Sequence, residues 1–268
     1  MVRLRRRGLA SINSEVRDGI VPAAGGVTIA PASEGGEDPP HKRSYKIVAL
    51  IIACALFMEQ MDATILATAL PAMARDFGVP APSLSSTLTA YLLALAIFIP
   101  ASGRLADRFG AKTVFRLAII TFLLGSILCG LAPNLPFMIL ARFIQGVGGA
   151  MMIPIGRLVL LRSVARQDMV SAISWLVMPA MIGPIVGPPV GGFIVTYLDW
   201  RWIFYLNVPI GLLGVVLVSL FIDDIRGERP VAADGWGFLL SGVSLGCLLL
   251  GFEMTSRSGE LPFALVLI

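Results

Sequence analysis

Apolar residues gather along this chain in blocks of about 20, and short polar or charged stretches separate the blocks. A helix needs about 20 residues to cross ~30 Å of hydrocarbon at ~1.5 Å per residue. Strands of a transmembrane β-barrel would instead alternate apolar and polar positions, which this chain does not do. The pattern therefore predicts membrane-spanning helices at about 47–71, 84–103, 114–132, 137–157, 170–197, 203–222 and 236–255.

Composition agrees with an all-α membrane protein. Of the 268 residues, 56% are hydrophobic and only 14% are charged, whereas soluble domains carry roughly 25% charged residues. Cys54, Cys129 and Cys247 lie inside apolar blocks without metal-ligand spacing, so we expect packing residues and no metal site. The single histidine, His41, lies in the N-terminal tail, and no nucleophile-and-base cluster suggests a membrane enzyme or a cofactor.

The chain divides into four expected segments. Residues 1–45 predict a disordered basic cytosolic tail, or the consequence of a misplaced start codon. Residues 46–222 predict a six-helix bundle, residues 223–235 a cytosolic linker, and residues 236–268 a seventh helix with the start of an eighth. Because the final "LPFALVLI" is too short to cross a bilayer, we expect a truncated chain that does not transport by itself.

Positive charge is distributed unevenly between the two sides of the predicted helices. Lys and Arg number 17 in the tail and the loops on its side, against three in the loops on the opposite side. The positive-inside rule then places the N-terminus in the cytoplasm of a multi-pass cell-membrane protein. This topology also explains the net charge of +4 without a nucleic-acid-binding surface.

Three charged residues stand out as candidates inside the predicted helices, namely Glu59, Asp62 and Arg142. Each costs at least ~2.5 kcal/mol in the membrane interior, so such residues usually have a function. Glu59 and Asp62 are three residues apart and share one helix face. Both they and Arg142 are expected in the outer half of the membrane, where they could meet. We favour a proton-binding carboxylate over a permanent structural ion pair, because one Arg cannot neutralise two carboxylates.

The stretch "GRLADRFGAK", residues 103–112, predicts a short loop between the second and third helices. Gly103 and Gly110 would allow a tight turn, and Asp107 would cap the following helix. Arg108 and Lys112 would lie on one side of it. By composition alone this is an ordinary charged loop, but the complete order of residues is more specific.

The fifth predicted helix contains "MIGPIVGPPVGGFI", residues 181–194. Glycine and proline each recur there every four residues. The glycines would form a stripe without side chains along one face of the helix, and the prolines beside it would each remove a backbone hydrogen bond. This pattern predicts a kinked, closely packed hinge, and the alternative is an irregular buried helix. The residues concerned are Gly183, Gly187, Gly191 and Gly192, with Pro184 and Pro188.

Together these motifs resemble the N-terminal half of a major facilitator superfamily transporter of the 14-helix drug/proton antiporter branch. "GRLADRFGAK" is similar to the signature loop, with Ala111 where a basic residue is common. "ARFIQGVGGA" resembles the arginine motif of the fourth helix, with Arg142, Gln145 and Gly146 in register. "GPPVGG" is similar to the antiporter motif of the fifth helix. "MDATILATALP" is similar to the motif of the first helix in this branch, with Ala67 in place of an Asn that is often found there.

The resemblance implies an alternating-access carrier of two six-helix bundles with two inserted helices, of which this chain holds the first bundle and part of the insert. It implies proton-coupled efflux of lipophilic or cationic drugs. Proton coupling and substrate contact would fall to Glu59, Asp62, Arg142 and Gln145. Asp107 with Arg108 would latch the loop. The glycine stripe would seal this bundle against helices that lie largely in the missing half.

Other interpretations remain open from the sequence. A sugar or organic-ion symporter of the same superfamily, an inactive fragment, and a membrane scaffold or sensor would share the apolar composition. Expected partners are a drug-like small molecule, protons and the lipid bilayer, with the missing C-terminal half or an adaptor protein. Several residues would line an apolar cavity or else pack the bundle, namely Met58, Met61, Tyr91, Met151 and Met152.

Overall fold

The computed structural model describes residues 45–222 together with 237, 240, 242–248 and 251. Within these residues all regular structure is helical, which confirms the predicted all-α fold. The expected linker at 223–235, nearly all of the expected tail, half of the predicted seventh helix and the expected start of an eighth lie outside the described residues. Residues 242–248 of that seventh helix are helical.

Six helical segments in the described part of the chain are long and apolar enough to cross a membrane. They coincide with the first six predicted blocks, and several extend beyond them because charged helix ends project past the apolar part. The elements are α2 (Tyr45–Phe77), α3 (Ser85–Phe109), α4 (Ala111–Gly130), α5 (Leu135–Ser163), α6 (Met169–Tyr197), α7 (Trp202–Tyr205) and α8 (Asn207–Phe221). Short 3-10 turns, η2 (Ala81–Leu84) and η3 (Arg166–Asp168), precede α3 and α6.

The turn between α3 and α4 is much shorter than the sequence predicted. Helix α3 continues to Phe109 and α4 begins at Ala111, so only Gly110 interrupts the helices. Gly110 has φ of 88°, a left-handed conformation that glycine adopts without strain. Gly103 lies within α3 and makes no turn, so the predicted role of Gly103 is wrong.

The sixth crossing is interrupted between α7 and α8 at Leu206. Pro209, in the first turn of α8, has no N–H to donate to the carbonyl four residues earlier, so it cannot continue the ladder from α7. The interruption places Asn207 at the beginning of α8 with its side chain fully buried. A polar side chain at a helix break inside an apolar block becomes part of the site described below.

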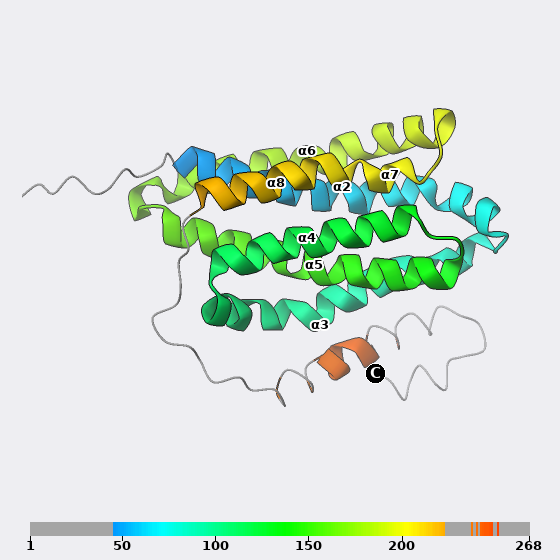
Figure 1. Ribbon diagram of the computed structural model, residues 1–268, viewed down its shortest axis with the longest axis horizontal. Coiled ribbons are helices and arrows are strands. Elements are labelled where there is room, and N and C mark those ends of the chain that lie inside the picture. The colour runs from blue at the N-terminus through cyan, green and yellow to red at the C-terminus, as the bar shows by residue number, and fades with distance from the viewer. Residues whose placement is uncertain (1–44, 223–236, 238–239, 241, 249–250, 252–268) are drawn as a thin grey trace, which may run out of the picture. The chain divides into compact units, whose positions relative to one another are not determined.

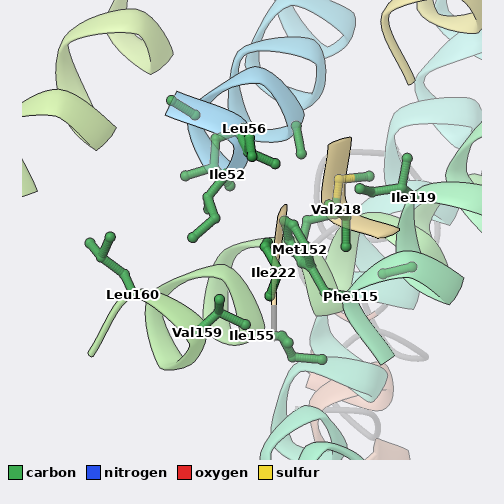
Figure 2. Packing of buried hydrophobic residues seen from close by; sticks show 14 of the residues in the cluster. Ile52, Leu56, Phe115, Ile119, Met152, Ile155, Val159, Leu160, Val218 and Ile222 are labelled. Carbon is green, nitrogen blue, oxygen red and sulfur yellow. The ribbon is translucent and has the colours of Figure 1, made fainter. Parts of the chain in front are cut away.

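The helices pack in pairs around a common core. Helix α2 lies against α6 and α8, while α4 lies against α5 and α8, and α3 lies against α5 (Figure 1). Figure 2 shows how side chains from α2, α4, α5 and α8 meet in one of the two apolar clusters, with Ile52, Phe115, Met152 and Val218 among them. Because lipid is as apolar as these side chains, close packing rather than the hydrophobic effect holds such helices together.

Glycine residues allow α4 and α5 to approach each other closely. A Cβ added to Gly125 would lie 2.5 Å from the Cα of Gln145, and one added to Gly148 would lie 2.6 Å from the carbonyl oxygen of Ala118. No side chain fits at either position without moving the backbone. The close approach brings Gln145 into reach of polar groups on α4.

Candidate functional site: a buried polar network beside an apolar groove

A polar network lies in the interior of the helix bundle and joins four helices. Its members are buried side chains from α2, α4, α5 and α8, namely Asp62, Ser126, Arg142, Gln145 and Asn207. Arg142, which is 1% exposed, is the largest fully buried side chain in the described part of the chain. Burying a charge in this way is costly unless the charge is paired, so the contacts of the network decide what each member can do.

Both oxygens of Asp62 accept hydrogen bonds. Arg142 donates from Nη1 to Asp62 Oδ2 at 2.7 Å, and this is also the ion pair that the sequence suggested between α2 and α5. Gln145 Nε2 and Asn207 Nδ2 both donate to Asp62 Oδ1, each at 2.9 Å. Three donors, one of them cationic, thus surround the two oxygens of Asp62.

Gln145 and Ser126 connect the remaining members. The Oε1 atom of Gln145 accepts a 2.7 Å hydrogen bond from Arg142 Nη1, while its Nε2 also donates to Ser126 Oγ at 2.8 Å. Asn207 donates to the same Ser126 oxygen at 3.2 Å. Sequence reasoning missed Ser126 and Asn207, because neutral polar residues inside apolar blocks carry a weaker signal than charges do.

Glu59 lies one helical turn from Asp62 and has a different environment. It is 4% exposed, and the only hydrogen bond found for it within the described residues comes from the Tyr91 hydroxyl, at 3.5 Å from Oε1. Its Oε2 atom has no partner there. The guanidinium of Arg142 lies over the Tyr91 ring, 4.5 Å from its centroid, and forms its ion pair with Asp62. Arg142 therefore forms its ion pair with Asp62, and Glu59 has no ion pair in the described part of the chain.

Two glycines of α5 make room for Tyr91 beside this network. A Cβ on Gly149 would lie 2.6 Å from the Tyr91 hydroxyl, and one on Gly146 would lie 2.7 Å from the Tyr91 carbonyl oxygen. The "GVGGA" stretch therefore packs α5 against α3 with Gly146 and Gly149, and against α4 with Gly148. Either substitution would displace the tyrosine that stands between Glu59 and Arg142.

The predicted loop residues lie at the ends of α3 and α4, away from the network. Asp107 is inside α3 and pairs with Arg162 of α5 at 3.0 Å, with both side chains about a quarter exposed. It does not cap α4, whose N-terminal cap is Gly110 without a side-chain hydrogen bond, so the predicted capping role is wrong. Lys112 donates to the carbonyl oxygen of Ser219 in α8 at 2.9 Å, and Arg108 lies beside the ring of Phe109.

The glycine stripe of α6 packs against α2, in the same bundle. A Cβ on Gly183 would lie 3.1 Å from the backbone of α2, and Cβ atoms on Gly187 and Gly191 would collide with the hydroxyls of Thr64 and Thr68. The expectation that this stripe faces helices in a missing half is therefore wrong. The four-residue period identified a bare face correctly, but it contains no information on which neighbour covers that face.

The other predicted hinge residues lie away from this contact. Nothing lies within 4 Å of a Cβ built on Gly192, so this glycine does not widen the packed stripe. Pro184 and Pro188 are exposed, and α6 remains helical throughout despite four prolines. The stripe and the prolines thus occupy different sides of α6.

An apolar groove of about 470 Å³ lies between α2, α5 and α6. Its wall consists of aliphatic side chains such as Leu176, Met181 and Ile185, with Gln60 and Arg157 as polar members. Of the residues expected to line a cavity, Met58, Met61, Met152 and Tyr91 are buried in the bundle and do not line this groove. Met151 lines a different apolar cavity of about 240 Å³ between α3, α4 and α5.

Comparisons with known proteins agree with the geometry. The family described as Major Facilitator Superfamily matches residues 52–267. A protein of Haemophilus influenzae named "Probable transport protein HsrA" is 43% identical over 218 residues, covering 81% of this chain and 47% of that protein. The "Putative multidrug resistance protein MdtD" of Yersinia enterocolitica is 42% identical over 215 residues, covering 80% of this chain and 46% of that protein. The chain thus spans about half the length of the curated relatives it matches.

A solved structure supports the same fold. The crystal structure of a D-xylose–proton symporter superposes with a TM-score of 0.59 at 15% identity, covering 66% of this chain and 48% of that chain. At this identity the likeness concerns the fold alone.

Proposed function

Because the chain belongs to the major facilitator superfamily, we propose that it works in proton-coupled export of lipophilic small molecules across the cell membrane. Export would proceed by alternating access of a central cavity. The relatives named as multidrug resistance proteins support the direction of transport. The observation that carries proton coupling is the unequal pairing of the two buried carboxylates, Glu59 and Asp62.

Glu59 is the better candidate for the exchangeable proton. Asp62 has both oxygens bonded and a cation at 2.7 Å, so adding a proton there would leave the buried charge of Arg142 without its partner. Glu59 has a free Oε2 and no ion pair within the described residues, so an added proton removes an unpaired buried charge. Binding and release of a proton at Glu59 would therefore favour different packings of α2.

The available driving force is sufficient for such coupling. One pH unit across a membrane supplies about 1.4 kcal/mol per proton, which corresponds to about a tenfold concentration ratio. A potential of ~100 mV adds about 2.3 kcal/mol for each net charge moved. The orientation proposed from the positive charges, with the N-terminus in the cytoplasm, would let protons enter while substrate leaves.

A sugar substrate is less consistent with the site. Sugars need several hydrogen-bonding side chains, whereas the groove beside the network offers Gln60 and Arg157 in an otherwise apolar wall. The arrangement suits a lipophilic molecule better.

Everted membrane vesicles containing the full product of the gene provide the test. A pH gradient, acid inside, should drive uptake of a lipophilic fluorescent drug. Glu59→Gln should abolish gradient-driven uptake but retain counterflow, in which labelled drug exchanges for unlabelled drug without a gradient. Asp76→Asn is the matched control, because it makes the same change near the far end of α2 at an exposed ion pair.

Two results would contradict the proposal. Absence of gradient-driven uptake with the unaltered protein would reject proton-coupled export. Gradient-driven uptake that is unchanged by Glu59→Gln would reject Glu59 as the coupling residue. Retained counterflow distinguishes a loss of coupling from a loss of folding.

A further inference from the structure

The groove between α2, α5 and α6 carries a positive charge that the bundle does not neutralise. Arg157 is exposed, lines the groove, and forms no ion pair or hydrogen bond within the part of the chain that the structure describes. By contrast, Arg162, five residues further along α5, pairs with Asp107 at 3.0 Å. None of the described residues lining the groove is acidic. The positive charge of Arg157 is therefore available to a ligand.

Size and lining make the groove suitable for a small molecule. Its volume of about 470 Å³ falls within the ~300–1,000 Å³ typical of ligand pockets, which are mostly apolar with few polar groups. Gln60 on α2 lies across the groove from α5 and supplies a second polar side chain that is exposed there. The apolar wall comes mainly from α6, including Val177, Met181 and Ile185.

Arg157 lies toward one end of α5, and its side-chain chemistry suits a negatively charged group. It lies six residues before the end of α5 at Ser163, which is ~9 Å at ~1.5 Å per residue. Its planar fork of N–H donors matches carboxylates and phosphates better than the point charge of lysine does.

We propose that this groove binds lipophilic organic anions, with the apolar body of the ligand against α6 and its negative group on Arg157. The proposal rests on the proposed export function and names its substrate class. It also differs from the resemblance-based expectation of cationic drugs, since the described lining of the groove offers a cation no opposite charge. Gln60 would donate a second hydrogen bond to the same anionic group.

Two probes with the same apolar body and opposite charge can test this. The full product of the gene is reconstituted in phosphatidylcholine nanodiscs and titrated with 4-(1-pyrenyl)butanoate or with 4-(1-pyrenyl)butyl-trimethylammonium. Trp175 of α6 is next in the chain to Leu176 of the groove wall, so energy transfer from tryptophan to pyrene reports binding nearby. Empty nanodiscs correct for partition into lipid, and Trp175→Phe should reduce the signal.

We expect the anion to bind at least tenfold more tightly than the cation. Arg157→Gln should remove this preference by weakening anion binding about tenfold, whereas Arg157→Lys should retain part of it. Arg166→Gln is the matched control, because Arg166 is exposed in η3 and does not line the groove. Size-exclusion profiles that match the unaltered protein exclude misfolding of the variants.

Three results would overturn the proposal. Equal affinity for both probes, or an Arg157→Gln protein that keeps the preference, would remove the assigned role of Arg157. Displacement of the anionic probe when phosphatidylglycerol replaces a fifth of the lipid would show that a lipid headgroup is the ligand instead. Because binding is measured without a gradient, failure here leaves gradient-driven export standing, and failure of export leaves anion binding standing.

Discussion

Replacing Arg142 by methionine should be among the most destabilising single changes in the bundle. The substitution keeps an unbranched side chain of similar length but removes the cation 2.7 Å from Asp62. Asp62 would keep two neutral donors, Gln145 and Asn207, yet its charge would be left uncompensated in the membrane interior. Breaking a buried ion pair by removing one partner costs about 3–5 kcal/mol, and the side chains are only 1% and 3% exposed.

A double substitution shows how much of the stability loss comes from the unpaired charge and how much from altered packing. Asp62→Asn combined with Arg142→Met removes both charges, and the new amide oxygen can still accept the two bonds from Gln145 and Asn207. We therefore expect the double variant to regain at least about 2 kcal/mol of what Arg142→Met loses, because no unpaired charge remains. If the two effects simply added, the double variant would be the least stable of the set.

Unfolding in mixed micelles measures these differences. The variants are titrated with sodium dodecyl sulfate and followed by tryptophan fluorescence, with the reaction of buried Cys129 with a thiol-specific dye as a second probe. Arg201→Met is the matched control, because its pair with Asp76 at 2.9 Å is partly exposed and should be worth about 0–1 kcal/mol. An Arg142→Met protein as stable as the Arg201→Met protein would refute the reasoning, and so would additivity in the double variant.

Two further predictions concern the contacts around the network. Gly187→Val should lower the free energy of unfolding by about 1–3 kcal/mol through overpacking, because the new side chain would collide with Thr64. Thermal denaturation in detergent should show a clearly lower melting temperature. Gly192→Val is the control and should change the melting temperature little, because nothing lies within 4 Å of a Cβ at Gly192. Asp107→Asn should cost at most about 1 kcal/mol, because the pair with Arg162 is partly exposed. Its effect should shrink in high salt, and a salt-independent loss measured in the same assay would contradict the ion-pair explanation.

The helices were predictable because a membrane allows few alternatives. A spanning segment must satisfy its own backbone hydrogen bonds, so a block of about 20 apolar residues has to be helical. The turn at residues 103–112 was less predictable, since charged residues continue a helix as readily as they form a loop. Helix α3 runs through Asp107 to Phe109, and only the positive φ of Gly110 ends it.

The candidate site was predictable only in part, for a related reason. Glu59, Asp62 and Arg142 are conspicuous because charges inside apolar blocks are rare. Asn207 is neutral and lies 145 residues from Asp62 in the chain, so only the folded structure reveals that α8 completes the network. The partner of the α6 glycine stripe was misjudged in the same way, because helical periodicity defines a face and not its neighbour.

The proposed proton site and the proposed groove lie on different faces of one helix, and this restricts how they can communicate. Glu59 and Gln60 are consecutive residues of α2, so their side chains project about 100° apart. Glu59 is buried beside Tyr91, whereas Gln60 is exposed in the groove. A ligand in the groove therefore does not compete with the proton for the same atoms. Coupling between the two has to pass through movement of α2, whose position is set on one side by the Asp62–Arg142 pair and on the other by the glycine stripe of α6.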